Sequence, residues 1–216
     1  MKMNFNIIIP ARKGSKGLPR KNQILLDETF EQIPREYHDK VIISTDDDTI
    51  ISRIKSYFSK CNIHHRSKES ARDSASTKEC IIETVRDFKL TGDIIMLYLT
   101  YPEREWKDIM HAYKWFVENQ AKSLLCREEI LTHPYLCLHD TGNNRGRQIV
   151  PHDYYRRQDY PKCFKICHMI SIFKTIEIKN LNNNLYNENT LYYKIPQTID
   201  VDTLSDLKKY KEKYDS

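Results

Sequence analysis

The fold of this chain is decided near its start by the stretch FNIIIPARKGSKGLPRKN, residues 5–22. Its first part, Phe5–Ile9, is an apolar run that ends at Pro10, which is typical of a parallel strand buried on both faces. The part that follows is a loop with two glycines and five basic side chains. Open α/β sheets bind ligands at the carboxyl ends of their strands, where this loop lies. The stretch therefore predicts a central strand and, directly after it, a candidate ligand-binding loop.

Strands and helices alternate along the rest of the chain. Apolar runs predict further strands at Val41–Thr45, Ile94–Leu99, Ser123–Cys126 and Phe164–Phe173. Apolar residues at helical spacing predict helices at Ile50–Phe58, Lys78–Phe88, Trp106–Val117 and Leu204–Tyr214. The side chains expected to face the core include Tyr57, Ile82, Leu204 and Tyr214. The alternation predicts a single α/β domain over residues 1–216, a three-layer α/β/α sandwich with a mainly parallel sheet.

The segment of about residues 127–165 breaks this alternation. It is rich in tyrosine, histidine, arginine and turn-forming residues, including the run Thr141–Asn144. We expect it to leave the sheet as a hairpin excursion. Its tyrosines and arginines within Asp153–Arg157 are of the kind that stack on RNA bases, or they could lie in a contact between two copies of the chain.

Length and composition bound the class of protein. With 216 residues, 39% hydrophobic and 30% charged, the chain fits one globular domain with a core of its own. No apolar run approaches the roughly 18 residues of a membrane helix. The first apolar stretch is too short for a signal peptide and no cleavage site follows it, so we expect a cytoplasmic protein without a membrane partner. The six cysteines never form a Cys-x-x-Cys pair, which predicts reduced, mostly buried thiols and no zinc site.

Basic residues are concentrated at the start of the chain. Residues 1–26 contain six of the 35 lysines and arginines and no acidic side chain, which leaves 29 basic against 30 acidic residues in the other 190. This distribution disfavours a nucleic-acid-binding protein coated with positive charge. It favours one focused anion site near the N-terminus.

The loop after the first strand carries most of this charge. Gly14 and Gly17 allow the backbone to turn sharply and to point several N–H groups inward, which makes an anion nest. The neighbouring lysines and arginines supply the charge to hold a triphosphate. The loop is neither a Walker A loop nor Gly-x-Gly-x-x-Gly, which disfavours a P-loop NTPase and a dehydrogenase. From composition alone, the alternative is a solvated loop.

Six segments, in order along essentially the whole chain, resemble the CMP-sialic acid synthetase (acylneuraminate cytidylyltransferase) family. They are Ala11–Asn22, Ile43–Asp46, Arg66 with Asp73–Thr77, Thr100 with Pro102 and Arg104, Arg157 and Gln158 with Pro161, and Ile199–Thr203. The resemblance implies a Rossmann-like nucleotidyltransferase fold. It also implies an enzyme that transfers CMP from CTP to the hydroxyl of an acidic sugar, with release of pyrophosphate, for the synthesis of surface glycans.

The resemblance assigns the nucleotide to a defined set of positions. The implied nucleotide-binding residues are Ala11, Arg12, Ser15, Lys16, Lys21, Asn22, Arg66, Ala75, Ser76 and Thr77. Arg12 and Lys21 would hold the triphosphate and stabilise the leaving pyrophosphate, because such transfers are catalysed mainly by positioning and electrostatics. Considered without the resemblance, Ser74–Thr77 is equally typical of a helix N-cap.

Asp200 and Asp202 are two residues apart, so on an extended segment their carboxylates point the same way. Paired carboxylates are hard oxygen ligands for Mg²⁺, which the family uses as its cofactor. Asp202 is also a catalytic candidate as general base, for which a metal-bound hydroxide is the other candidate. The alternative for Asp202 is a cap on the last helix.

The acceptor half departs from the family. The implied acceptor-binding residues are Tyr98, Thr100, Arg104, Arg157, Gln158 and Lys165. Tyr98 stands where the family has glutamine, and Cys167 stands where it has asparagine. We therefore expect an acceptor other than N-acetylneuraminate, such as another nonulosonate or a 3-deoxy-2-keto acid. The alternative is a catalytically silent homologue that binds nucleotide. The family also makes its homodimer contacts with the 127–165 segment.

Overall fold

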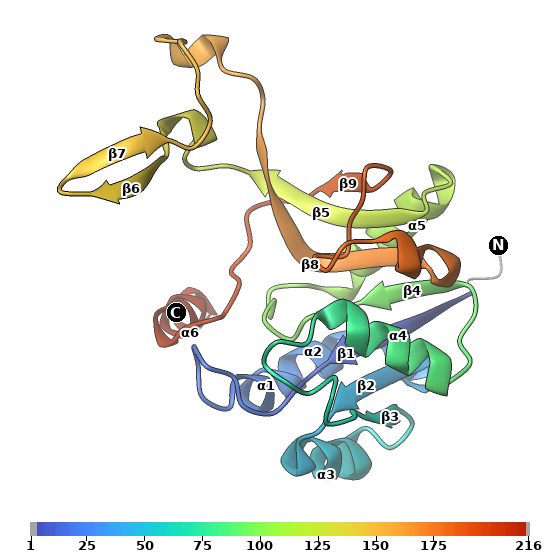
Figure 1. Cartoon of the computed structure of the whole chain (residues 1–216). Helices are drawn as coiled ribbons and strands as arrows, with labels where there is room; N and C mark the ends of the chain where they lie inside the picture. Colours follow the sequence, from blue (N-terminus) through green and yellow to red (C-terminus); the bar gives the residue numbers. More distant parts are fainter. Residues whose placement is uncertain (1–3, 215–216) are drawn as a thin grey trace.

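The computed structural model describes residues 4–214, and Figure 1 shows how its elements are arranged. The main sheet has seven strands in the order β3-β2-β1-β4-β8-β5-β9. These strands are β1 Phe5–Pro10, β2 Val41–Thr45, β3 Asn62–His65, β4 Asp93–Met96, β5 Ser123–Glu129, β8 Phe164–Lys174 and β9 Leu191–Lys194. The α-helices are α1 Lys21–Ile24, α2 Leu26–Gln32, α3 Asp48–Tyr57, α4 Thr77–Asp87, α5 Trp106–Glu118 and α6 Leu204–Tyr214. The 3₁₀ helices of the main body are η1 Arg35–Lys40 and η4 Thr175–Asn180.

The predicted parallel strand lies at the centre of one half of the sheet. β1 pairs in parallel with β2 on one side and with β4 on the other, so that Ile7 lies opposite Val41 and Ile95. In the other half, β8 runs antiparallel to both β4 and β5. The sheet is thus mainly parallel, as expected, with one reversed strand inserted beside β4.

Side chains of β1 alternate between two hydrophobic clusters, one on each face of the sheet. Ile7 and Ile9 belong to the cluster that also includes buried side chains of α2, α3, α5 and α6. Ile8 belongs to the cluster that includes Ile81 of α4 and Ile178 of η4. Helices therefore cover both faces, which confirms the three-layer α/β/α architecture.

Four side chains that were expected in the core are exposed. The exposed fractions are 78% for Tyr57, 58% for Leu204, 55% for Tyr214 and 43% for Ile82. Each of these helices buries fewer of its apolar side chains than their spacing suggests. In α6, for example, Leu207 is the one buried residue. The Tyr214 hydroxyl instead donates a hydrogen bond to Oε1 of Glu103 at 3.2 Å. None of the helices within residues 4–214 combines the length and the low polarity needed to cross a bilayer.

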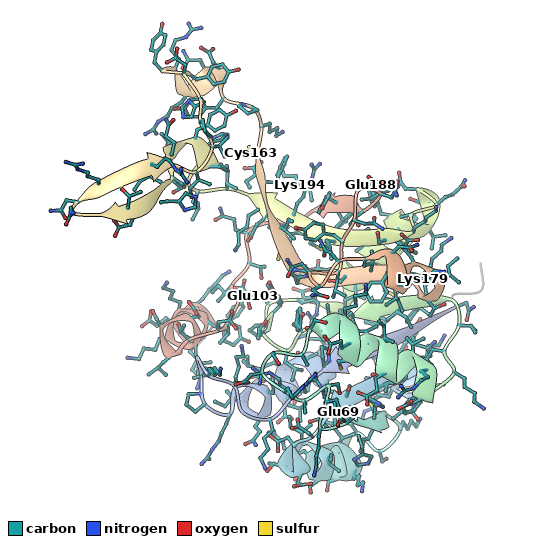
Figure 2. All side chains as sticks on the ribbon, viewed as in Figure 1. Glu69, Glu103, Cys163, Lys179, Glu188 and Lys194 are labelled. Atoms are coloured by element: carbon teal, nitrogen blue, oxygen red, sulfur yellow. The ribbon has the colours of Figure 1, made fainter. Side chains whose placement is uncertain are left out.

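The segment between β5 and β8, residues 130–163, is the hairpin excursion. It starts three residues later than the expected boundary of 127 because β5 continues to Glu129. It contains β6 Leu138–Gly142, β7 Arg145–Gln148, η2 Pro134–Leu136 and η3 Arg157–Asp159. Figure 1 shows the excursion projecting away from the main sheet, and Cys163 in Figure 2 marks the point where the chain returns to it.

Candidate functional site

The loop that follows β1 (the basic loop, residues 11–20) is fixed at the carboxyl edge of the sheet by β2. Ala11 N donates to Ser44 O at 2.8 Å, and the Thr45 hydroxyl donates to Ala11 O at 2.6 Å. Directly after β2, the Asp46 carboxylate accepts a hydrogen bond from Lys13 N at 2.7 Å. The loop is therefore anchored through its backbone, which leaves its cationic side chains free to face a ligand.

Glycine is required at two positions of the basic loop. Gly14 has a φ of +79°, a left-handed conformation that other residues rarely adopt. At Gly17 a Cβ would lie 2.5 Å from the carbonyl oxygen of Asp202. The absence of a side chain at Gly17 thus lets the basic loop touch the segment that precedes α6, although the two are far apart in the sequence.

Three cations of this region face two carboxylates. Nη1 of Arg12 binds one oxygen of Asp73, and Nζ of Lys16 lies 2.8 Å from the other. Nζ of Lys21 binds Oδ1 of Asp202. The hydrogen bonds from Lys16 and then Arg12 lower the pKa of Asp73, so this carboxyl group is ionised at neutral pH. The cationic lining is held in place by acidic side chains that an anion could replace.

Asp200 and Asp202 lie on an irregular segment beside the end of β4, with a tight turn at Val201, where Asp202 N donates to Asp200 O at 3.1 Å. Val201 N donates to Thr100 O at 2.8 Å, and the Val201 side chain is buried in the core. The Tyr101 hydroxyl donates to Oδ2 of Asp200 at 2.9 Å, whereas Oδ1 is buried without a hydrogen bond of ordinary geometry. Asp202 keeps an exposed carboxylate. A buried orphan oxygen next to an exposed carboxylate fits a divalent cation with oxygen ligands.

Burial raises the pKa of Asp200, and the negative charge of Asp202 adds to this effect. A positive charge near Asp200 would relieve this penalty. The alternative role of Asp202 as helix cap is filled by Thr203, whose hydroxyl accepts from Asp206 N while Asp206 accepts from Thr203 N. The carboxylate of Asp202 is therefore not used as the helix cap and is available to bind a ligand.

The expected base-recognition segment lies next to the basic loop. Asn22 donates from its amide to Arg12 O at 2.9 Å. Arg66 donates to Ser70 O, and its Nε is buried without a hydrogen-bond partner. Ser76 forms a capping box with Glu79 at the start of α4, so the N-cap alternative also holds. Ala75, beside Ser76, is half-buried, so part of its surface is accessible to a ligand.

The expected acceptor residues fall into three groups. Tyr98 and Thr100 follow β4, where the Tyr98 hydroxyl donates to the hydroxyl of Thr77 at 2.7 Å. Both residues lie close to the base segment and to Asp200. Lys165 lies on β8, with its Nζ 2.8 Å from Oε1 of the buried Glu128. The hydrogen bond to Glu128 raises the pKa of Lys165, and Lys165 is close enough to Asp200 for the charge of that carboxylate to add to this effect, so these three residues lie on the side of the site next to Asp200.

Arg104 is buried and turned toward the backbone. It is 3% exposed, and its Nη1 donates to Tyr98 O at 3.0 Å and to Met169 O at 2.7 Å. The register between β5 and β8 shifts at this point, so residues 168–170 of β8 have no partner in β5. Arg104 thus holds an irregular stretch of β8 to the end of β4. Burial lowers the pKa of Arg104 to about 10, which leaves the guanidinium charged at neutral pH.

Arg157 and Gln158 are not brought to the site within one chain. Both are exposed and lie in η3 at the end of the excursion, away from the basic loop (Figure 1). Whatever they contact must lie outside their own sheet.

Three contributions to the site were not anticipated from the sequence. Asp73 pairs with the cations, and Tyr101 binds Asp200. Glu103 joins the turn after β4 to α6 through an ion pair with Lys213 at 2.6 Å, and it also accepts from Ile199 N at 2.9 Å (Figure 2). Asp73 belongs to one of the segments that resemble the family, and its acidic side chain next to a predicted cationic site is the one sequence signal for this pairing. For the contacts of Tyr101 and Glu103 the sequence offers no such signal.

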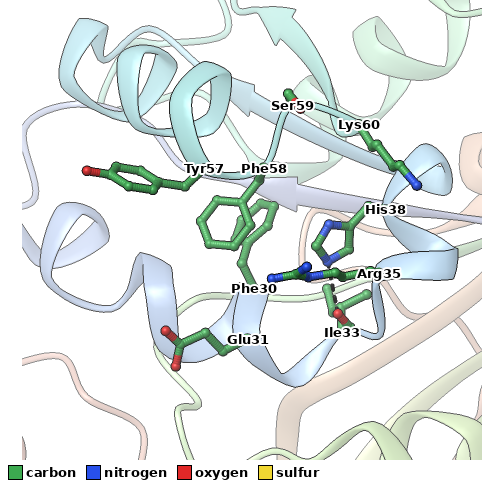
Figure 3. A pocket seen from close by; sticks show the side chains of 9 residues that line it. All are labelled: Phe30, Glu31, Ile33, Arg35, His38, Tyr57, Phe58, Ser59 and Lys60. Atoms are coloured by element: carbon green, nitrogen blue, oxygen red, sulfur yellow. Dashed lines mark hydrogen bonds between the residues drawn. The ribbon is translucent and has the colours of Figure 1, made fainter.

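A pocket of about 460 Å³ lies elsewhere on the molecule, between α2, η1 and the end of α3 (Figure 3). Its lining includes Phe30, Arg35, His38 and Phe58. Because η1 leads into the amino end of β2, this pocket lies at the opposite end of that strand from the basic loop. It is separate from the candidate site.

Comparison with known proteins gives consistent matches over the length of the chain. A sequence model of the family described as Cytidylyltransferase matches residues 6–213. The pseudaminic acid cytidylyltransferase of Campylobacter jejuni subsp. jejuni serotype O:2 is 27% identical over 214 residues, covering 93% of this chain and 91% of that protein. The N-acylneuraminate cytidylyltransferase of Streptococcus agalactiae serotype V is 27% identical over 160 residues, covering 70% of this chain and 39% of that protein.

The fold has a similar counterpart among solved structures. A CMP:2-keto-3-deoxy-manno-octonic acid synthetase in complex with CTP matches with a TM-score of 0.71 and 15% identity, covering 97% of this chain and 98% of that one. At this identity the likeness bears on the fold alone.

Proposed function

The chain belongs to the cytidylyltransferase family, and from this premise we propose that it transfers CMP from CTP to the hydroxyl of an acidic, sialic acid-like sugar. The acceptor oxygen would bond to the α-phosphorus of CTP, the bond to the bridging oxygen of the β-phosphate would break, and pyrophosphate would leave. The observation that carries the proposal is the convergence of Arg12 and Lys21 with Asp200 and Asp202 at the carboxyl edge of a parallel sheet.

The basic loop would bind the triphosphate. Arg12 can bridge two phosphate oxygens, whereas Lys16 and Lys21 act as point charges. The phosphates would take the place of Asp73 against Arg12 and Lys16, with the backbone N–H groups around Ser15 assisting. Lys21 would then stabilise the charge that develops on the leaving pyrophosphate.

Asp200 and Asp202 would hold Mg²⁺, which supplies positive charge to the phosphate oxygens when it is bound. The unpartnered Oδ1 of Asp200 supports this assignment. Asp202, which is exposed and adjacent to Lys21, is the candidate for the group that takes the proton of the acceptor hydroxyl. Its contact with Lys21 keeps it oriented toward the reacting atoms.

Cytosine offers an amino donor and two acceptors, so it calls for small polar groups and backbone. We assign it to Asn22, Arg66 and the segment Ala75–Thr77. The hydrogen bond between Tyr98 and Thr77 joins this segment to the acceptor side. The acceptor would lie against Tyr98, Thr100 and Lys165.

The acceptor is proposed to be a nonulosonate other than N-acetylneuraminate. Tyr98, which stands where the family has glutamine, packs edge-on against His168 with ring centroids 6.0 Å apart, so no side-chain amide is present at Tyr98 to bind a sugar hydroxyl. The similarity to a pseudaminic acid cytidylyltransferase over nearly the full length of both chains supports the same choice.

We further propose that the enzyme is a cytoplasmic homodimer formed through the excursion. The excursion exposes large apolar side chains, including Leu131 and Tyr155, which is typical of a surface that binds another protein. Arg157 and Gln158, which are remote from their own basic loop, would reach the acceptor in the site of the partner.

A pyrophosphate-release assay with Mg²⁺ tests the proposed function. We expect turnover with CTP and not with ATP, GTP or UTP, and a faster rate with a pseudaminate-type acid than with N-acetylneuraminate or a 3-deoxy-2-keto acid. Selective binding of CTP without turnover on any acid would instead identify a silent homologue. Fastest turnover with N-acetylneuraminate would contradict the proposed acceptor.

A further inference from the structure

A second cluster of ligand-type side chains lies outside the proposed active site. It consists of His64 on β3 with Glu83 and Asp87, which are one turn apart on α4. Within residues 4–214 this is the one group of three such side chains whose ligand atoms all lie within 4.8 Å of one another. The cluster opens to solvent through Asp87, whereas the His64 side chain is 4% exposed.

Two hydroxyl groups face Nδ1 of His64. Nδ1 lies 3.1 Å from the hydroxyl of Thr84, which donates its single proton to Cys80 O at 2.8 Å. Thr84 can therefore only accept from Nδ1, and it favours the tautomer with the proton on that nitrogen. The Ser44 hydroxyl, 2.8 Å from Nδ1, accepts a hydrogen bond from the Cys80 thiol and can either accept from Nδ1 or donate to it.

In this tautomer Nε2 presents a lone pair to an anionic oxygen. Nε2 lies 3.2 Å from Oδ2 of Asp87, and the carboxylate of Glu83 lies nearby. Two acceptors that face each other are stable only with a positive charge between them, which is either a second proton on the imidazole or a metal ion. A metal-bound histidine commonly donates its other ring N–H to an oxygen, as His64 does in this arrangement.

We propose that His64, Glu83 and Asp87 bind a divalent first-row transition-metal ion such as Zn²⁺ or Co²⁺. One imidazole with two carboxylates suits such ions better than Mg²⁺, which prefers oxygen ligands alone. Arg86 occupies Oδ1 of Asp87 at 2.7 Å, so Asp87 binds through Oδ2 alone. Water completes the coordination on the exposed side.

The ion joins three parts of the chain. Glu83 also accepts hydrogen bonds from Ser67 N at 3.3 Å and from the Ser70 hydroxyl. These residues form the turn after β3, and Ser70 O accepts from Arg66. A bound metal therefore fixes β3, α4 and the turn that orients Arg66. The site is structural, and it does not depend on the reaction assigned to the chain.

The test is a titration of the metal-free, full-length protein with Co²⁺ or Zn²⁺ in excess Mg²⁺, followed by equilibrium dialysis and metal quantification. We expect the wild-type chain to bind one more ion than Asp87→Ala, or to bind it at least about tenfold more tightly. Glu83→Gln should show the same loss. His65→Gln, which changes an exposed neighbour on β3, should bind as the wild type does.

The altered side chain of Asp87 is exposed, so this variant should fold, and circular dichroism with thermal unfolding verifies that it does. Zn²⁺ should also raise the melting temperature of the wild type more than that of Asp87→Ala. Equal binding and equal thermal shifts in the wild type and Asp87→Ala would overturn the proposal. So would a wild-type chain that binds no Co²⁺ or Zn²⁺, since Nε2 would then donate a hydrogen bond to Asp87 without any metal.

Discussion

The proposed role of Lys21 depends both on its positive charge and on where its ammonium group lies. Its ammonium group binds Asp202, and it lies at the start of α1, where the basic loop ends. Lys21→Gln removes the charge and leaves a polar side chain that is one atom shorter. We expect kcat to fall by about 10²–10³-fold, the usual loss when one donor to a developing oxyanion is removed.

Steady-state kinetics with CTP measure the effect of Lys21→Gln. The matched control is Lys13→Gln, because Lys13 is exposed and anchors the loop through its backbone N–H rather than its side chain. Equal losses in the two variants would show that total charge, rather than the place of Lys21, determines the rate.

Asp73 binds Arg12 and Lys16, so in the proposed complex it would compete with the phosphates of CTP for these cations. Asp73→Asn removes that competitor, so CTP should bind about two- to fivefold more tightly, the range expected for exposed ion pairs. Calorimetric titration with CTP and Mg²⁺ measures the change, which should shrink at high salt because exposed charges are screened. Asp48→Asn, in an exposed position on α3, is the control. Weaker binding by Asp73→Asn would mean that Asp73 orients Arg12 for the nucleotide.

Asp200 should oppose folding and favour metal binding. Its pKa is raised by burial, so its ionised form destabilises the folded chain at neutral pH, and the penalty disappears below the unfolded pKa of about 4. Without divalent ions, Asp200→Asn should melt at the same or a higher temperature than the wild type at pH 7. The difference should vanish as the pH falls toward 4.

Mg²⁺ should reverse this order of stability. The wild type should gain thermal stability with millimolar Mg²⁺, whereas Asp200→Asn should gain little and should lose activity. A destabilised Asp200→Asn in metal-free buffer would show that the Tyr101 hydrogen bond outweighs the cost of burying the charge.

At the scale of elements, the contact between the basic loop and the segment before α6 determines the geometry of the site. Gly17→Ala would place a methyl group 2.5 Å from the Asp202 carbonyl oxygen and force the two apart. A displacement of about 1 Å can cost about 10²-fold in rate, so we expect a loss of that order in kcat. The kinetics should be compared with Ser205→Ala, an exposed change in α6. Unchanged kinetics in Gly17→Ala would show that the contact is not needed.

The sequence predicts the elements with strong local signals and misses those without them. The apolar runs of β1, β2 and β4 predict buried parallel strands, and the structure confirms this prediction. β3 and β9 have four residues each and are mostly half-buried or exposed, so their local patterns are weak. The antiparallel direction of β8 follows from pairing with β4 and β5, which no local pattern encodes.

The candidate site also has parts that the local sequence predicts and parts that depend on tertiary contacts. The cations of the basic loop follow from local composition, and the resemblance connects them with Asp200 and Asp202. The pairing of Arg12 with Asp73 is a tertiary contact across 61 residues, and the sequence gives no geometry for it. Arg104 matches the family position, but its burial against Met169 O depends on the irregular register of β8.

At the scale of the whole molecule, the position of Arg157 and Gln158 predicts a site shared between two chains. Lys21→Gln and Gln158→Ala should each be nearly inactive alone. In a mixed dimer one site would carry both changes and the other neither, so random mixing should restore about a quarter of wild-type activity. Co-expression followed by rate measurement tests this, and light scattering verifies the dimer. A mixture no more active than the mean of the two variants would place Lys21 and Gln158 in the same chain's site.

β8 gives the excursion a direct connection to the interior of the molecule. The strand begins at Phe164, where the excursion returns, pairs there with β5 alone, and lies between β4 and β5 from Ser171 to Phe173. Along the way it carries Lys165 and the carbonyl that Arg104 holds. A second copy that binds the outer hairpin would thus act on Lys165, on the proposed acceptor side, through one continuous backbone. Changes in quaternary contacts could retune acceptor choice over evolutionary time while the nucleotide side of the enzyme stayed as it is.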